Sequence, residues 1–281
     1  MVNFILAKLD AKPFRWILCM LIRTVYLIRR KEPIKNVFYH KTFKLWGYQF
    51  TKTFFWNTGP GWITSKKYFE SQLRRYFANQ YQPKNGDIVI DLGAGLGEEA
   101  ILMSDWVGET GKVYAVEATP RIAKALTYAK EVNKLDNLLV FNLAINHKNE
   151  GVEIFDDHGY VGNTINTTVK NMTNSFAVPG ITFDEFFHEQ GLKHVDLLKV
   201  NIEGAEQFMI MGMDKSVSKI KNIAVSCHDF RFVNNGESEF YKTMNVVKSF
   251  FNENGFSITL LATDDILQRH IVFGKNLAFL E

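Results

Sequence analysis

The sequence predicts an α/β fold with a mostly parallel, helix-covered sheet, on three observations. Short aliphatic runs alternate with longer amphipathic stretches from residue 84 onwards, which is the pattern of alternating strands and helices in such folds. A glycine-rich loop follows the first aliphatic run. The last two runs are separated by a short stretch rich in polar residues, which indicates an antiparallel pair beside the parallel strands.

Each element can be placed in chain order from these patterns. Thr119 before Pro120 is typical of a helix start, because the hydroxyl residue caps the first turn and proline suits its first position. The expected strands are residues 88–90, 113–116, 138–143, 195–200, 223–226, 256–261 and 271–273, and the expected helices are residues 98–107, 120–132, 183–190, 204–213 and 239–253.

The composition is that of a globular protein with a sizeable core. Hydrophobic residues make up 46% and charged residues 22% of the 281, which excludes a disordered or fibrous chain. Two cysteines, Cys19 and Cys227, are too few for a disulfide framework and fit a reducing, cytoplasmic compartment. No apolar run approaches the roughly 18 to 20 residues of a membrane-spanning helix.

Net charge separates an N-terminal segment from a body. Residues 1–35 carry a net +6, so the remaining residues carry −3 of the total of +3. We expect residues 1–35 to form a basic, apolar helix that either lies peripherally on an anionic membrane or packs on the body. Because the body is mildly acidic, we expect no nucleic-acid partner.

The rest of the chain divides at a turn signal. Residues 36–83 are dense in aromatic side chains and end at Pro83-Lys-Asn-Gly86. We expect this segment to be a cap whose Phe and Trp rings line the substrate side of the ligand site, and residues 84–281 to form the ligand-binding domain.

The loop after the first strand has the features of a ligand site. It runs Asp91-Leu-Gly-Ala-Gly-Leu-Gly97, with Gly93, Ala94 and Gly95 at its centre. Glycines allow close backbone approach, and a following helix offers unpaired N–H groups to an anion. The G-x-G-x-G spacing differs from the G-x-G-x-x-G of dinucleotide sites. We expect a zwitterionic ligand, with its carboxylate at the loop N–H groups and its amino group near Asp91.

A second acidic residue extends this site. Glu117 ends the second strand, 24 residues after Gly93, where a carboxylate accepts hydrogen bonds from a ribose diol. Ala118 follows it, and Asn142 after the third strand is a candidate adenine contact. Carboxylate, amine and ribose together describe S-adenosyl-L-methionine (SAM), so the pattern resembles a class I methyltransferase. The alternative is that Asp91 completes a turn and Glu117 is a solvated strand end.

A longer motif is more specific. The chain reads Ile181-Thr-Phe-Asp-Glu-Phe-Phe-His, and later Val195-Asp-Leu-Leu-Lys-Val-Asn-Ile-Glu-Gly-Ala-Glu206. These segments are similar to the FkbM family of SAM-dependent methyltransferases, and the resemblance covers about residues 85–262. It implies a Rossmann-like class I fold with a seven-stranded sheet, helices on both faces and a C-terminal antiparallel pair. It also implies SAM as cofactor and methyl transfer to hydroxyl groups, often of sugars.

Two departures from the family pattern affect the acceptor side. Asn201 replaces the usual aspartate on the fourth strand, and Val-Ser-Cys-His, ending at His228, lacks the usual glutamate of the fifth. An amide is not a base, so any mechanism that needs a metal or paired acids at these points is in doubt. These losses support the alternative of a non-catalytic SAM-fold module that acts as a membrane-associated binding or scaffold protein.

Five residues are the candidates for catalysis. His228 is the candidate base, because an alcohol must lose a proton and histidine titrates near neutral pH; Asp229 would orient its ring. The alternative is a histidine that caps the strand end. Glu203 either binds the substrate hydroxyl or caps a helix. Lys199 shares the strand face of Asn201, and pairs with Glu203 or Asp91 or points at substrate. No metal ligands are expected from the spacing of histidines and cysteines.

The sequence thus predicts a SAM-dependent O-methyltransferase. Its expected acceptor is a hydroxyl of a sugar or glycoconjugate. The expected location is cytoplasmic, with peripheral contact to the inner face of a membrane through residues 1–35 as the open alternative.

Overall fold

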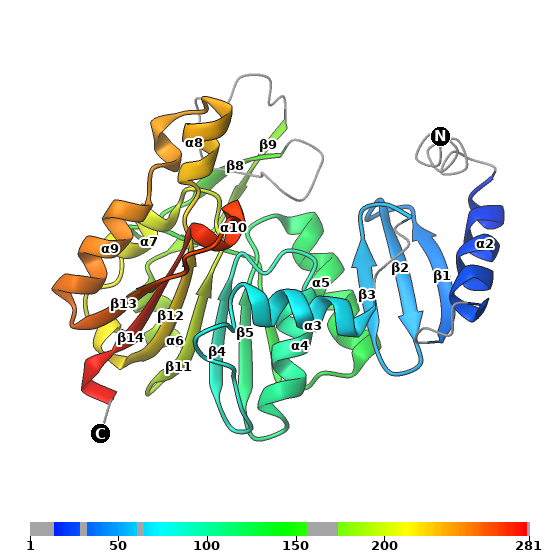
Figure 1. Ribbon diagram of the computed structural model, residues 1–281, viewed down its shortest axis with the longest axis horizontal. Helices are drawn as coiled ribbons and strands as arrows, with labels where there is room; N and C mark the ends of the chain where they lie inside the picture. The colour runs from blue at the N-terminus through cyan, green and yellow to red at the C-terminus, as the bar shows by residue number, and fades with distance from the viewer. Residues whose placement is uncertain (1–13, 29–32, 61–64, 157–173, 280–281) are drawn as a thin grey trace.

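The computed structural model describes residues 14–28, 33–60, 65–156 and 174–279. It contains a large central sheet and, towards the N-terminus, a smaller antiparallel sheet flanked by one helix (Figure 1). Of the N-terminal segment expected at 1–35, residues 1–13 and 29–32 lie outside the described residues.

The central sheet has seven strands in the order β13-β14-β12-β11-β4-β5-β6. Five strands run parallel to one another: β4, β5, β6, β11 and β12. Strand β14 is antiparallel to both of its neighbours, β12 and β13. The sequence prediction of a mostly parallel sheet with a C-terminal antiparallel pair is confirmed. The bounds are β4 Ile88–Leu92, β5 Lys112–Val116, β6 Leu138–Phe141, β11 Val195–Val200, β12 Ile220–Ser226, β13 Phe256–Leu260 and β14 Ile271–Asn276.

Strand β11 lies at the centre of this sheet, and all six of its residues are buried. It pairs on one side with β12 and on the other with β4. Because β4 is also followed by β5 on its far side, the order of the chain reverses between β4 and β11. Ligands in open α/β sheets bind at the carboxyl ends of the strands at such a point.

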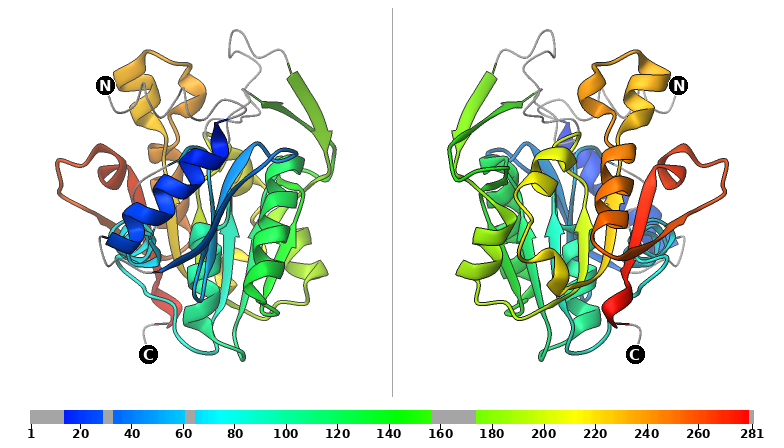
Figure 2. Two further views of the ribbon diagram at one scale, coloured as in Figure 1. Left: turned by 90° about the vertical axis from the view of Figure 1, so that its right-hand side faces the viewer. Right: turned by 90° about the vertical axis from the view of Figure 1, so that its left-hand side faces the viewer.

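Helices cover both faces of the sheet (Figure 2). The pleat sends alternate side chains to opposite faces, so Val89 packs in one hydrophobic cluster and Ile90 in the other. The first cluster includes residues of α3 (Lys66–Arg75), α4 (Glu98–Val107) and α5 (Pro120–Asn133), and the second includes residues of α6 (Phe183–Glu189), α7 (Glu206–Met211) and α9 (Met244–Glu253).

Shorter elements connect the main strands and helices, most of them at the carboxyl ends of the parallel strands. Hairpin β8–β9 rises above the sheet beside the carboxyl ends (Figure 2), and the short parallel pair β7–β10 lies at its base. Most of these short elements were not expected from the sequence, and the helix expected at 239–253 is divided into a 3₁₀ turn and α9. They are β7 Ala144–Ile145, β8 Val152–Asp156, β9 Asn174–Val178, β10 Gly180–Ile181, α8 Asp229–Asn235, α10 Ile266–Arg269, and the 3₁₀ helices Val217–Lys219, Glu239–Tyr241 and Leu277–Phe279.

Most of the aromatic-rich segment forms its own antiparallel sheet, and only Tyr68 and Phe69 of its described aromatic residues line the cavity described below. Strands β1 (Ile34–His40), β2 (Leu45–Phe50) and β3 (Phe54–Asn57) pair in sequence order. Trp56 is fully buried, and its ring lies 5.2 Å from that of Tyr128 on α5. Its Nε1 donates to the carbonyl of Ala125 at 2.7 Å. The expected aromatic substrate wall is therefore wrong for most of these rings, because a three-stranded sheet needs them as its core.

Helix α2 (Arg15–Ile28) packs one face on this small sheet. Leu18, Ile22 and Tyr26 follow one another at helical spacing and are all buried, as the alternative of a helix packed on the body predicts. Trp16 and Met20, on other faces, stay exposed. Within the described residues, no helix has the length and hydrophobicity required to cross a bilayer.

Candidate active site

A cavity of about 390 Å³ opens where β4, β5 and β11 end, in the size range of small-ligand sites. The glycine loop forms its floor, α3 contributes Tyr68 and Gln72, and β8 contributes Val152 from the opposite side. The cavity lies at the chain reversal between β4 and β11. Its predicted lining residues are Gly93, Ala94, Gly95, Glu117, Ala118, Lys199, Asn201 and Glu203.

Close backbone contact explains two glycines of the loop. Gly93 has a φ of 75°, and a Cβ there would lie 1.9 Å from the carbonyl oxygen of Asn201, so the loops after β4 and β11 touch at this point. Gly97, with a φ of 90°, begins α4, and its Cβ would meet Leu126 at 2.1 Å. Gly97 does not line the cavity, so its role is to bring α4 against α5.

The expected anion cradle of loop N–H groups is not formed by these residues. The amides of Gly93 and Ala94 both donate to the carbonyl of Val116, at 3.0 and 3.1 Å, and the amide of Gly97 donates to Ala94. The amide of Gly95 donates to the carboxylate of Glu117. The loop therefore shapes the cavity with its backbone, and these four amides are already used within the protein.

Glu117 is held in the cavity wall by two backbone amides. One carboxylate oxygen accepts from Gly95 at 2.9 Å and the other from Thr119 at 2.7 Å. Burial raises the pKa of Glu117, and the two N–H groups act in the opposite direction. Each carboxylate oxygen can accept a second hydrogen bond, so both can receive a ribose hydroxyl. The predicted ribose contact fits this geometry.

Asn142 does not reach the cavity. Its Nδ2 donates to the carbonyls of Glu117 and Ala118, at 2.9 and 2.8 Å, and its side chain is exposed. The predicted adenine contact is therefore wrong, because the side-chain amide of Asn142 donates both of these hydrogen bonds to the loop after β5. Leu143, the next residue, lines the cavity together with Ala118, and both offer apolar surface to a flat ring.

A buried ion cluster lies beneath the glycine loop. The Lys199 ammonium lies 2.7 Å from Asp91 and 3.0 Å from Glu99, and it donates to the carbonyl of Gly93 at 3.1 Å. Lys199 and Asp91 are register partners on neighbouring strands, which explains their contact. Burial lowers the pKa of Lys199, but the two carboxylates outweigh it and raise the pKa overall. Lys199 thus pairs with Asp91, one of the partners expected from the sequence.

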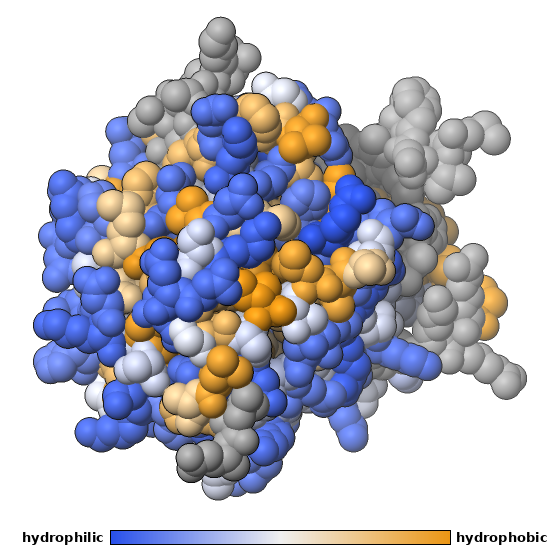
Figure 3. Space-filling view, turned by 60° about the vertical axis from the view of Figure 1, so that its left-hand side comes forward, coloured by the Kyte–Doolittle hydropathy of each residue, from blue (hydrophilic) through white to orange (hydrophobic). Residues whose placement is uncertain are grey.

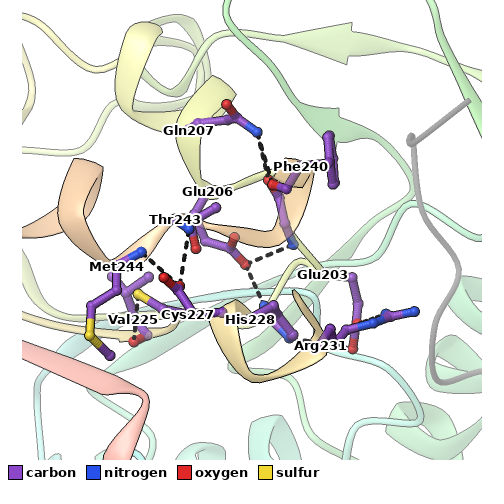
Figure 4. Close-up of polar contacts among 12 residues, drawn as sticks. Glu203, Glu206, Gln207, Val225, Cys227, His228, Arg231, Phe240, Thr243 and Met244 are labelled. Atoms are coloured by element: carbon purple, nitrogen blue, oxygen red, sulfur yellow. Dashed lines mark hydrogen bonds and ion pairs between the residues drawn. The ribbon is translucent and has the colours of Figure 1, made fainter. Parts of the chain in front are cut away.

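A second carboxylate in the cavity wall is anchored by two cations (Figure 4). Glu203 has a φ of 55°, uncommon outside glycine, and its side chain lies 3.5 Å from His228 Nε2 and 2.5 Å from Arg231. Burial raises the pKa of Glu203, but His228 and Arg231 outweigh it and lower the pKa overall. Glu203 is therefore ionised at neutral pH, beside Asn201 in the cavity wall.

His228 is placed as a cation and not as a base. Its Nδ1 lies 3.0 Å from the fully buried Glu206, its Nε2 faces Glu203, and the ring is 3% exposed. Burial lowers the pKa of His228, but the two carboxylates raise it to about 10. An imidazolium has no lone pair for a proton, so the candidate base of the sequence prediction is not available at neutral pH. His228 itself does not line the cavity.

Asp229 has no contact with the His228 ring. Its carboxylate accepts from the amides of Thr243 and Met244, at 3.0 and 2.9 Å, and so caps α9. Its predicted role of orienting the histidine belongs instead to Glu206. Among the residues that the structure describes, no three His, Cys, Asp or Glu side chains are grouped to hold a metal ion.

The sequence comparison identifies the family. Residues 91–258 match the model of the methyltransferase FkbM domain, which is more than half of the chain. The protein belongs to the FkbM methyltransferase family. It is a SAM-dependent methyltransferase, and S-adenosyl-L-methionine is its cofactor. The search of curated protein sequences found no match.

The search of solved structures matched methyltransferases at low sequence identity. Fibrillarin from Aeropyrum pernix, with natively bound S-adenosyl-L-methionine, is 16% identical over 87% of this chain and 99% of its own, with a TM-score of 0.43. The FkbM methyltransferase from Methylobacillus flagellatus is 13% identical over 75% of this chain and 50% of its own, with a TM-score of 0.47.

Sequence reasoning missed three residues of the site. Glu206 belongs to the family motif, but nothing in the sequence indicates that it pairs with His228. Glu99 also carries no sequence signal for its role, which is to pair with the buried Lys199. Arg231 carries no sequence signal, because its contact with Glu203 depends on how α8 folds back over the end of β11.

Proposed function

We propose that this FkbM methyltransferase transfers the SAM methyl group to a hydroxyl of a sugar or glycoconjugate. The observation that carries the proposal is the ionised Glu203 carboxylate, held in the cavity wall by His228 and Arg231. A fixed carboxylate binds and orients a hydroxyl donor. Asn201 beside it can donate to or accept from a second hydroxyl.

The chain's own residues supply position and a proton acceptor. Bound SAM supplies an electrophilic methyl group, and the acceptor oxygen forms its new carbon bond as the bond from carbon to sulfur breaks. Glu203 accepts a hydrogen bond from the hydroxyl and takes its proton as the ether forms, before passing it to water. Orientation of this kind supplies roughly 7–11 kcal/mol in favourable cases, so a weak base suffices.

A row of partly exposed rings supports a saccharide as the acceptor class. The rings of His147 and Phe208 lie 5.5 Å apart, and those of Phe208 and Phe240 lie 6.2 Å apart. Phe240 packs over Gly204, next to Glu203, and His147 follows the cavity residue Asn146. Ring faces match the C–H faces of sugars. The row lies beside the cavity, whereas Tyr68 and Phe69 of segment 36–83 line the cavity itself.

The test is an acceptor screen with methyl-labelled SAM and saccharides that carry free hydroxyls. The wild type should yield a methyl ether. Glu203→Gln should lower kcat about a hundredfold or more with SAM affinity unchanged. Glu237→Gln is the matched control, because Glu237 also pairs with Arg231 but does not line the cavity; it should retain most activity. Full activity in Glu203→Gln, or label only on nitrogen or carboxyl groups, would refute the proposal.

A further inference from the structure

The outward face of α2 exposes large apolar side chains. Trp16 is 61%, Met20 58% and Ile28 74% exposed, whereas Leu18 and Ile22 on the inner face are fully buried. Packing on the small sheet therefore uses only one side of this helix. The other side offers a cluster of apolar residues that a monomer in water does not normally leave uncovered.

The part of the sequence that contains α2 is strongly basic. Residues 11–60 contain ten basic residues and a single acidic one, Glu32. Their net charge is +9, so the remainder of the chain carries −6 of the total of +3. Five of these cations are exposed and form no ion pair within the part of the chain that the structure describes: Arg23, Lys35, Lys41, Lys44 and Lys52.

Cations and apolar residues share one surface here. A hollow of about 500 Å³ between α2 and β1 is lined by Trp16 together with Arg15 and Lys41. The Arg15 guanidinium lies 3.5 Å from the ring centroid of Tyr39, which fixes that charge beside the hollow. In Figure 1, α2 lies at the end of the molecule, with the sheet β1–β3 between it and the larger sheet.

We propose that the outward face of α2 docks on an anionic lipid membrane, with Trp16, Met20 and Ile28 inserted among the headgroups. A helix with apolar and basic residues in this arrangement lies in the interface and does not cross the bilayer. No helix in the described ranges is built to span a membrane. Anionic lipids are concentrated on the cytoplasmic leaflet, so docking would hold the enzyme at the inner face of a membrane.

Other partners fit these features less well. A second copy docked on the same face would bring exposed cations such as Arg23 and Lys41 of both copies together, and such like-charge contact opposes association. A nucleic acid would use the cations but would leave the apolar side chains of α2 in water. Elsewhere, on the face shown in Figure 3, hydrophobic residues lie in small groups among hydrophilic ones.

The experiment is cosedimentation of the full-length protein with phosphatidylcholine vesicles, with and without phosphatidylglycerol. The wild type should bind only the anionic vesicles, and binding should weaken as salt is raised. The double variant Trp16→Ser, Met20→Ser should bind at least about tenfold more weakly, because binding no longer transfers two large apolar side chains from water into the lipid. Arg23→Glu should also weaken binding.

The matched control is Leu267→Ser with Leu277→Ser, which removes two apolar side chains of similar exposure from another part of the molecule. It should bind vesicles like the wild type. The proposal is overturned if the wild type ignores anionic vesicles, if the α2 variant binds as well as the control, or if α2 instead governs dimerisation or RNA binding. Because α2 is remote from the cavity, methyl transfer to a water-soluble acceptor should be unchanged in the α2 variant.

Discussion

Replacement of His228 by glutamine is expected to destabilise the protein in a pH-dependent manner. The ring carries a proton between Glu206 and Glu203, and its pKa moves from 6.5 to about 10 on folding. One pKa unit corresponds to about 1.4 kcal/mol, so the charged ring contributes up to about 5 kcal/mol. Removal of one partner from a buried ion pair typically costs roughly 3–5 kcal/mol, which agrees with the contribution calculated from the pKa of His228.

The direction of the pH dependence of stability follows from the raised pKa of His228. The stabilisation is complete below about pH 6.5, where the unfolded histidine is also protonated, and it is lost as the pH rises through about 10. The gap between wild type and His228→Gln should therefore be several kcal/mol at pH 7 and close to zero near pH 10. Glutamine fills similar space but carries no charge to offset the buried Glu206.

Urea unfolding at several pH values between 7 and 10 measures this gap. His188→Gln is the matched control, because that histidine is exposed on α6, and it should match the wild type at every pH. Nuclear magnetic resonance of the His228 ring provides a direct check. A gap that is constant across this range, or a ring that titrates near 6.5, would refute the assignment of His228 as a buried cation.

Three further changes test the cofactor side. Glu117→Gln should weaken SAM binding about tenfold to a hundredfold in calorimetry, because a charged acceptor for the ribose is lost; unchanged affinity would remove the ribose assignment. Lys199→Met should lower the free energy of unfolding by about 3–5 kcal/mol, because Asp91 would be buried without its cation; an unchanged urea midpoint would contradict this. Gly93→Ala should abolish SAM binding, since its Cβ would collide with the Asn201 carbonyl; binding at wild-type affinity would refute that.

The sheet was predictable because its signals are local. Buried parallel strands are short apolar runs, and α5 begins at Pro120 after Thr119 as expected. Strand boundaries differ from the prediction where pairing decides them: β12 begins at Ile220, three residues earlier than expected, because Ile220 pairs with Val195 of β11. The small sheet β1–β3 was missed, since its aromatic residues alternate too irregularly to distinguish a core from a substrate wall.

The location of the site could be predicted from the sequence, but the roles of several of its residues could not. Glu117 and Glu203 fall in the cavity wall because the ends of parallel strands meet there. The protonation of His228 depends on Glu206, which approaches from α7, and no spacing in the sequence fixes that contact. Asn142 follows the third parallel strand, where a ligand contact is expected from the sequence. Its amide donates instead to the backbone carbonyls of Glu117 and Ala118.

The most direct test of the central claim is a crystal structure with S-adenosyl-L-homocysteine and a saccharide acceptor bound. Both ribose hydroxyls should contact the Glu117 carboxylate, and the acceptor hydroxyl nearest the sulfur should lie within hydrogen-bonding distance of Glu203. A nucleoside bound away from Glu117, or an acceptor hydroxyl that faces away from Glu203, would contradict the account.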